Sequence, residues 1–269
     1  DVWIYCGDNL HSRHTLKAGV TTVLHLEKPE TLSLVEEERL EKVRFAPQVW
    51  RALLGLNASL QFLYLDTFGY SRRPPRREEL PEFTWLAYGS SITCGSKAWA
   101  YPSAYVNQAA LRLHADVMNK GLSGTCRCED YVADYIAAQQ ADVLTLELGI
   151  NMINTFSPEE FAKKVHYLLE TIRKNSAAKH VFVMDMFRNK SAIYRNKQAA
   201  NCVNYPVFCG IVEQEAMASA ELDGRFHYIE GKEIGKDLSY LTVDFLHPSD
   251  EGHCLMGEKL ANAMKRFII

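Results

Sequence analysis

The sequence of 269 residues lacks several features that mark large classes of protein. It has no apolar run of the roughly 18 residues that a membrane-spanning helix needs, so we expect no membrane span. It also has little excess charge of either sign. The formal net charge of −3 gives no electrostatic reason to expect nucleic acid as a partner. The remaining composition, 47% hydrophobic and 23% charged, is typical of a globular protein with a sizeable core.

Cysteine is present, but its pattern excludes the usual structural uses. The seven cysteines are odd in number and scattered along the chain, which argues against a disulfide framework. Cys126 and Cys128 have one residue between them, whereas structural zinc sites have two to four. Free thiols indicate a reducing compartment, so we expect a cytoplasmic protein. No signal peptide is visible at Asp1, although a chain without an initial Met is also compatible with a leader that has been removed.

Residues 1–80 are predicted to form a small β domain of the sandwich type. Short apolar runs alternate there with polar turns, and no long helical period appears. Residues 21–26 and 59–65 have the composition of strands, and 43–45 is a further candidate. The proline-rich and charged stretch 71–81 has the composition of a connector between domains.

Residues 81–269 are predicted to form an α/β domain in which strands and helices alternate. Strand signals occur at 83–88, 115–118, 142–148, 181–184 and 226–229. Helix signals begin near residues 102, 157 and 250, and Ser157 followed by Pro158 and Glu160 has the pattern of a capping box. This alternation predicts a doubly wound, flavodoxin-like parallel sheet with helices on both faces, which gives a three-layer α/β/α domain.

Reactive groups in an open α/β sheet gather where the strands end. The first predicted strand is followed by Gly89-Ser90-Ser91, where a glycine allows the sharp turn that exposes a hydroxyl. The second is followed by a glycine-containing segment with Gly124, and the third by Asn151, whose amide can point at a developing oxyanion. Each of the three patterns, taken alone, is also typical of an ordinary turn or helix cap.

A carboxylate and an imidazole stand three residues apart near the C-terminus, at Asp244 and His247. With this spacing the Asp can hold one ring nitrogen and direct the other toward a nucleophile. His253 is the competing histidine, and we expect it to be a surface or helix-start residue of the last helix. Glu147 lies in a buried strand, where we expect it to satisfy a local hydrogen bond.

In this order, Ser91, Gly124, Asn151 and Asp244 with His247 give the chain a pattern that resembles the SGNH hydrolase superfamily. That superfamily, also called the GDSL-like lipases and esterases, has a G-D-S block, a Gly block, an Asn block and a D-x-x-H block. The resemblance covers roughly residues 83–269.

Two further likenesses point to one subgroup of this superfamily, and two positions depart from the superfamily's usual pattern. Residues 45–51 and the junction at Pro81 look like the small β domain that some bacterial members carry, and residues 147–152 look like the same subgroup. The usual Asp before the nucleophile is Ser90 here, and the Asp that often follows the Asn block is Met152. Neither position belongs to the triad.

The resemblance implies a mechanism. His247 is expected to take the proton of Ser91, which attacks an ester carbonyl and forms an acyl-enzyme. The backbone N–H groups of Ser91 and Gly124, with the Asn151 amide, are expected to stabilise the oxyanion. Asp244 is expected to fix the tautomer of His247. No metal or cofactor is required.

We therefore predict a serine esterase that acts on small-molecule or carbohydrate esters of small acyl groups, acetyl being the first expectation. Two alternatives stay open: an acyltransferase that uses the same acyl-enzyme, and a catalytically inert binding protein on the same fold. A dinucleotide-binding protein is disfavoured because no G-x-G-x-x-G follows the first strand of the α/β domain. The sequence leaves the oligomeric state open, and it is compatible with a homo-oligomer.

Overall fold

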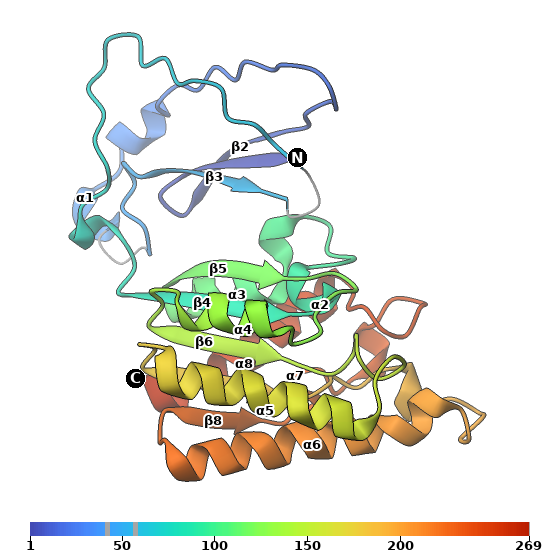
Figure 1. Cartoon of the computed structure of the whole chain (residues 1–269). Coiled ribbons are helices and arrows are strands. Elements are labelled where there is room, and N and C mark those ends of the chain that lie inside the picture. Colours follow the sequence, from blue (N-terminus) through green and yellow to red (C-terminus); the bar gives the residue numbers. More distant parts are fainter. Residues whose placement is uncertain (41–43, 56–58, 269) are drawn as a thin grey trace. The chain divides into compact units, whose positions relative to one another are not determined.

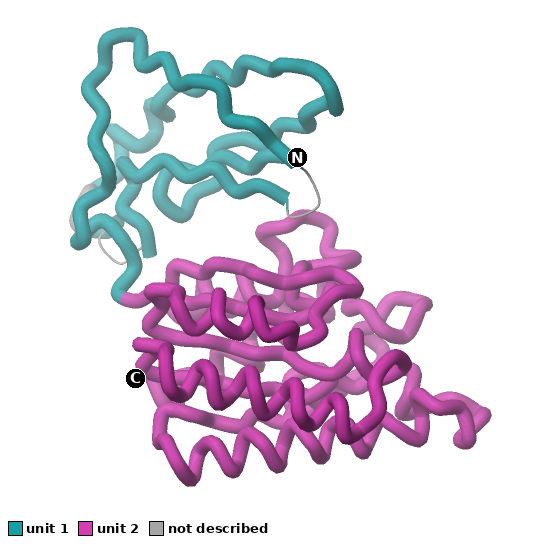
Figure 2. The backbone as a smooth tube through the Cα atoms, in the orientation of Figure 1, with its two compact units in different colours: residues 1–82 teal, residues 83–269 magenta. Residues whose placement is uncertain are grey.

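The computed structural model describes residues 1–40, 44–55 and 59–268. The backbone divides into two compact units, residues 1–82 and residues 83–269 (Figure 2). Within the described ranges, no helix combines the length and the apolar composition that crossing a membrane requires.

The first unit contains a small antiparallel sheet, as the sequence predicts for this part of the chain. Its strands, in the order β2-β1-β3, are β1 (Val2–Cys6), β2 (Asn9–His14) and β3 (Trp50–Leu54). The remaining elements of the unit are η1 (Glu30–Ser33), α1 (Glu37–Leu40) and η2 (Arg77–Glu79). Gly7 turns the chain between β1 and β2 with φ +58°, a left-handed conformation that glycine adopts without strain.

The prediction of strands at 21–26 and 59–65 is wrong, because neither segment pairs with a strand among the described residues. Most of their apolar side chains are exposed, for example Val23 at 71% and Phe62 at 80%, whereas Leu24 and Leu26 are half-buried. A β-branched and aromatic composition favours a strand only where a neighbouring strand and a packed face support it. Within the described residues neither segment has that support.

The segment expected to form a strand at 43–45 is held by polar contacts instead. Residue 43 lies outside the described residues, and Arg44 and Phe45 form a bend. The Asp8 carboxylate accepts the backbone N–H of Arg44 at 2.6 Å and that of Phe45 at 3.3 Å. Asp8 also forms ion pairs with Arg44 at 3.0 Å and Arg51 at 3.3 Å. These contacts tie the bend to the β1–β2 turn.

The second unit is a three-layer α/β/α fold with one fully parallel sheet, which confirms the predicted fold class (Figure 1). Its strands are β4 (Phe83–Gly89), β5 (Ala115–Gly121), β6 (Val143–Glu147), β7 (His180–Met184) and β8 (Phe226–Ile229). They lie in the order β5-β4-β6-β7-β8. This is the flavodoxin-like order, in which the chain runs outward in both directions from its first strand, so the switch point lies between β4 and β6.

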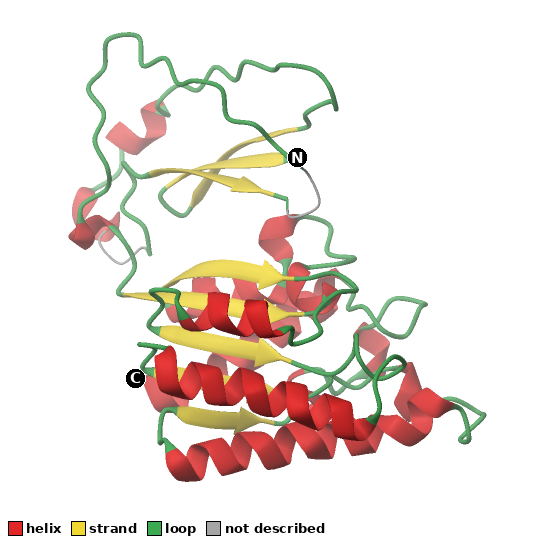
Figure 3. Ribbon diagram, in the orientation of Figure 1, coloured by secondary structure: helices red, strands yellow, loops and turns green. Residues whose placement is uncertain are grey.

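Helices cover both faces of this sheet (Figures 1 and 3). The helices are α2 (Ser91–Cys94), α3 (Tyr105–Leu113), α4 (Asp130–Ala137), α5 (Pro158–Asn175), α6 (Ala200–Leu222), α7 (Gly231–Ile234) and α8 (Asp250–Ile268). The 3-10 segments are η3 (Tyr101–Ser103), η4 (Lys190–Ala192) and η5 (Leu238–Tyr240). One core joins α4, α5 and α6 to one face, and a second joins α3 and α8 to the other. The capping box predicted at Ser157 begins α5.

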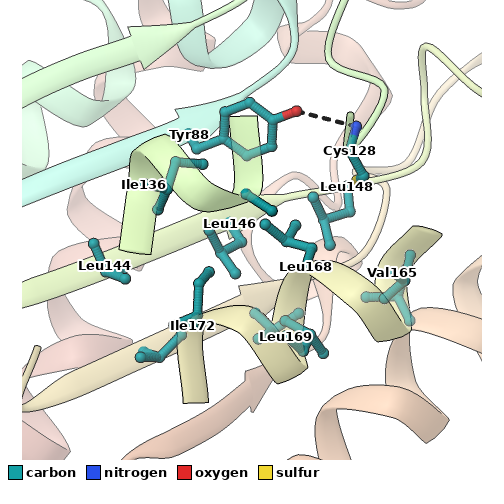
Figure 4. Close-up of a cluster of buried hydrophobic side chains, with 14 of the residues drawn as sticks. Tyr88, Cys128, Ile136, Leu144, Leu146, Leu148, Val165, Leu168, Leu169 and Ile172 are labelled. Carbon is teal, nitrogen blue, oxygen red and sulfur yellow. Dashed lines mark hydrogen bonds between the residues drawn. The ribbon is translucent and has the colours of Figure 1, made fainter. Parts of the chain in front are cut away.

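β6 shows why the strand sequence is almost continuously apolar. Leu144 and Leu146 pack into the core on the α5 side, where Leu168 and Ile172 meet them (Figure 4). Val143 belongs to the opposite core, beneath α3 and α8. A strand that is covered on both faces needs apolar residues at successive positions rather than at alternate ones.

Two paired glycines let the chain after β4 lie directly on the edge of the sheet. Gly89 and Gly121 are register partners in β4 and β5. A Cβ on Gly121 would lie 2.3 Å from the backbone nitrogen of Cys94, and a Cβ on Gly89 would lie 2.2 Å from the Thr93 hydroxyl. The short helix α2 can therefore sit where it does only because both positions lack a side chain.

We predict that Gly121→Ala destabilises the second unit by about 3 kcal/mol, because the methyl group meets backbone atoms that cannot rotate away. Gly210→Ala is the matched control, since a Cβ there has no neighbour within 4 Å and Ala is favoured over Gly inside a helix by about 1 kcal/mol. Denaturant unfolding followed by circular dichroism measures both. Equal effects of the two substitutions would contradict the close packing at Gly121.

Candidate active site

Ser91 is presented by a tight turn between β4 and α2. Ser90 caps the helix, and its hydroxyl accepts the N–H of Ile92 at 3.2 Å. Gly95 ends the helix after one turn with φ +93°. Ser91 is 8% exposed, so its hydroxyl lies in a packed setting at the carboxyl end of the sheet, with limited access to solvent.

Ser91, His247 and Asp244 form a continuous chain of hydrogen bonds. Ser91 Oγ lies 2.9 Å from His247 Nε2, and His247 Nδ1 lies 2.7 Å from Asp244 Oδ2. An ionised carboxylate can only accept, so Nδ1 carries the ring proton. In the neutral imidazole Nε2 is then unprotonated and accepts the hydroxyl of Ser91. The tautomer therefore follows from the charge on Asp244.

The turn that carries Asp244 and His247 stabilises the negative charge of Asp244. The second oxygen of Asp244, Oδ1, accepts the backbone N–H of Leu246 and of His247, each at 2.9 Å, and the Thr242 hydroxyl at 3.0 Å. Partial burial would raise the pKa of Asp244, but the hydrogen bonds from His247, Leu246 and Thr242 outweigh it and hold the pKa well below its usual range. Phe245 takes the left-handed φ of +51° that closes the turn.

Asn151 and Gly124 follow the strands on either side of β4. The Asn151 side-chain oxygen accepts the N–H of Cys126 at 3.1 Å, which leaves the amide nitrogen facing away from that bond. Gly124 lies on the exposed part of the same loop with φ +73°. The loop begins at Gly121 and is tied to β4 by Leu122 N–H on the Gly89 carbonyl at 2.8 Å. The structure thus brings both predicted residues to the edge that carries Ser91, without a direct hydrogen bond to it among the described residues.

His253 is buried, which corrects the expectation of a surface residue, although it does lie at the start of α8, as its fourth residue. It is 0% exposed, and it lies on the inward face of α8 with Met256, Leu260 and Met264. Its Nδ1 accepts the backbone N–H of Tyr105 at 3.3 Å, and its Nε2 lies 3.2 Å from the carbonyl oxygen of Ser96, to which it donates. Burial lowers the pKa of His253, which favours the neutral ring. The helical spacing 253-256-260-264 was the sequence signal for burial.

Asp250 and Ser96 take part in the site, although the sequence patterns did not single them out. Ser96 N–H donates to the carbonyl of Ser91 at 2.9 Å, and the Asp250 carboxylate accepts the N–H of Trp99 at 2.5 Å. With the His253 contact, these bonds fix the loop after α2 to the start of α8. The bonds between Trp99 and Asp250 and between Ser96 and His253 join positions 151 and 157 residues apart, so only the fold reveals them.

Among the described residues, no cluster of three or more His, Cys, Asp or Glu side chains is arranged to hold a metal ion. All seven cysteines are free thiols.

A parallel α/β/α sheet with a hydrogen-bonded Ser, His and Asp at its carboxyl edge is an architecture found among hydrolases. The chain belongs to the GDSL-like lipase/acylhydrolase family, whose model matches residues 84–268. The resemblance to the SGNH superfamily is thereby confirmed for the second unit. The match begins after the first unit, so its likeness to the small β domain of bacterial members stays a prediction.

Solved structures share the fold of the second unit. A Bacteroides ovatus protein named as a GDSL-like lipase is 25% identical, with a TM-score of 0.59 over 70% of this chain and 54% of its own. A salicylyl-acyltransferase from a tetracycline biosynthetic pathway is 18% identical, with a TM-score of 0.59 over 69% and 54%. A family two carbohydrate esterase from Clostridium thermocellum is 17% identical, with a TM-score of 0.53 over 72% and 66%. The chain thus spans about half the length of the first two, and curated protein sequences give no match.

We predict that Asp244→Asn lowers the free energy of unfolding by about 1 kcal/mol at pH 7, a modest figure because solvent screens the partly exposed carboxylate. A carboxyl group with a lowered folded-state pKa contributes stability above its unfolded value of 3.8, and this is lost as the pH falls further. The difference between wild type and variant should therefore shrink below about pH 3.8. Urea unfolding across pH measures it, and a difference independent of pH would contradict the assignment.

Proposed function

We propose that the chain is a serine esterase in which Ser91 is the nucleophile, His247 the general base and Asp244 the residue that fixes the base. The observation that carries the proposal is the hydrogen-bond chain, 2.9 Å from Ser91 to His247 and 2.7 Å from His247 to Asp244. Both distances lie in the range at which proton transfer needs no rearrangement. Family membership supports ester chemistry at this site.

The reaction proceeds through an acyl-enzyme. As Ser91 Oγ attacks the ester carbonyl, its proton passes to His247 Nε2, and the carbonyl oxygen gains the negative charge. The N–H groups of Ser91 and Gly124 and the Asn151 amide are the donors proposed for that oxyanion, each typically contributing about 10²–10³ in turnover. His247 then protonates the departing alcohol. A water molecule then attacks the acyl carbon and loses its proton to His247; the bond to Ser91 Oγ breaks, the acid leaves and His247 returns the proton to Ser91.

Trp99 favours a carbohydrate as the alcohol part of the ester. Its side chain is 77% exposed, yet its backbone is fixed by Asp250, and Ser96 three residues earlier is bonded to Ser91. Three residues of chain span at most about 11 Å, so the Trp99 indole is close enough to Ser91 for an oligosaccharide of a few sugar rings to reach both. A flat, exposed aromatic face on a backbone that is anchored near a reactive group suits stacking against the apolar face of a pyranose ring. We propose that the acyl group, acetyl first, is carried by such a ring.

We predict that Ser91→Ala abolishes hydrolysis of p-nitrophenyl acetate, with kcat falling at least about 10⁴-fold because, among the described residues, Ser91 supplies the hydroxyl bonded to His247 Nε2. Wild-type activity should decline from acetate to butyrate to octanoate. Release of p-nitrophenol measures the hydrolysis of all three esters. Ser219→Ala on α6 is the matched control, since the Ser219 hydroxyl donates to the Glu215 carbonyl.

Unchanged activity in Ser91→Ala would remove Ser91 as the nucleophile. A rate that rises when an acceptor alcohol is added, with the acylated alcohol as product, would make acyl transfer the main reaction and hydrolysis the side reaction. A wild type that neither hydrolyses esters nor reacts with a fluorophosphonate would favour an inert binding protein.

We predict that Trp99→Ala raises KM for an acetylated xylo- or cello-oligosaccharide about tenfold with little change in kcat, since stacking on the alcohol part is equal in ground and transition states. Ethyl acetate, which has no ring, should be hydrolysed as by wild type. Tyr131→Ala, which removes an aromatic ring that is 72% exposed on α4, is the control. An equal loss on both esters would show that Trp99 acts on the site's structure rather than on the sugar.

A further inference from the structure

Glu147, the last residue of β6, lies directly behind the nucleophile turn. It is 1% exposed. Its Oε2 accepts the backbone N–H of Ser90 at 2.6 Å and the hydroxyl of Thr93 at 3.1 Å. These two residues flank Ser91 on the chain. A Cβ on Gly89 would lie 2.7 Å from the same oxygen, so the carboxylate reaches the turn only because position 89 is glycine.

The same residue joins the nucleophile turn to the loop after β5, which carries Gly124 and Cys126. Thr93 is bonded in turn to the hydroxyl of the buried Tyr105 at 2.8 Å. The backbone carbonyl of Glu147 accepts the thiol of Cys126 at 3.6 Å, and the Cys126 N–H holds the Asn151 side chain. A shift of Glu147 would therefore move Ser91 and Asn151 relative to each other.

No cation compensates this carboxylate among the described residues. Its Oε1 is buried and has no hydrogen-bond partner. The titratable groups that face it are Tyr105 on α3 and Cys126 and Cys128 on the loop after β5, and burial raises the pKa of all three, so they stay neutral. Burial also raises the pKa of Glu147 to about 7, against the hydrogen bonds from Ser90 and Thr93. A fold that needed only packing here would be served by an uncharged side chain.

We propose that Glu147 is a positioning residue: its ionised carboxylate holds the Ser90 N–H and the Thr93 hydroxyl and thereby fixes Ser91 opposite His247. The inference rests on the proposed function, since it assigns Glu147 a role in orienting that nucleophile. A carboxylate accepts an N–H about twice as strongly as a neutral acid does. Protonation of Glu147 therefore loosens the turn, and the esterase loses rate as the pH falls through neutrality.

The test is Glu147→Gln, which keeps the shape of the side chain and imitates the protonated acid at every pH. We expect kcat for p-nitrophenyl acetate to fall about tenfold above pH 7 with KM nearly unchanged, because a small misplacement of a reacting group has a large effect on rate. The ratio of wild-type to variant kcat should shrink as the pH falls below about 7, since the wild-type side chain then becomes neutral as well. Thr93→Val, which removes a single donor, should cause a smaller fall in the same direction.

Stability separates positioning from a merely structural role. The folded state of wild type holds the Glu147 proton up to about pH 7, whereas the unfolded chain releases it near 4.5, so wild-type stability falls with rising pH across that window. Glu147→Gln does not titrate, and its melting temperature should rise relative to wild type between pH 4.5 and 7. The variant is thus expected to be more stable and less active. A structural role predicts lower stability together with lower activity.

Asp185→Asn is the matched control. Asp185 is another buried acid, which follows the neighbouring strand β7 and accepts the N–H of Gly231 rather than contacting the Ser91 turn. Its substitution should leave kcat unchanged. If wild type is active, Ser91→Ala is inactive and Glu147→Gln has the wild-type kcat and pH profile, the role of Glu147 is overturned and the proposed function stands. If Ser91→Ala remains active, the proposed function fails, and this inference fails with it.

Discussion

The site depends on how closely the backbone after β4 approaches the end of the sheet. Gly89 and Gly121 face each other in register, and a methyl group on either would overlap the helix that begins with Ser91. Because that helix lies on the strand ends, its first residue, Ser91, lies at the same edge as the loops that follow β5 and β6 and the loop that carries His247. The parallel order places all these ends on one edge, and the switch point between β4 and β6 is the place where open α/β sheets bind their ligands. The chemistry thus follows from a packing constraint that involves no reactive group.

Two carboxylates near Ser91 are held in opposite electrostatic settings. Asp244 is partly exposed and accepts four hydrogen bonds, which keeps it ionised. Glu147 is buried with one oxygen unpartnered, which raises its pKa. Hydrogen bonds to a charged group are worth about 1.5–3 kcal/mol each, whereas removing a carboxylate from water costs several kcal/mol. Since both side chains carry the same ionising group, the number of hydrogen-bond donors and the access to water decide whether the pKa of each is raised or lowered.

His247 and His253 also differ in their hydrogen-bond partners. His247 has a carboxylate on Nδ1, so its Nε2 accepts from Ser91. His253 has a carbonyl on Nε2 and a backbone N–H on Nδ1, so both nitrogens are occupied by the main chain and neither can accept a proton without breaking the packing. His253 instead supports the loop that carries Ser96 and Trp99. The proposed base and the structural residue are therefore distinguished by their hydrogen-bond partners.

The sequence by itself determined the architecture of the second unit and supplied the residues that are proposed for its active site. Strand and helix periods, the capping box at Ser157 and the order of Ser91, Gly124, Asn151 and Asp244 with His247 are local patterns, and local patterns survive in a single sequence. The tertiary structure alone decided the strands of the first unit, the burial of His253 and the environment of Glu147. Strand pairing, solvent access and hydrogen bonds between distant residues depend on neighbours that no short window contains. The exposed segments 21–26 and 59–65 show the limit: their composition favours strands, but within the described residues no neighbouring strand pairs with them.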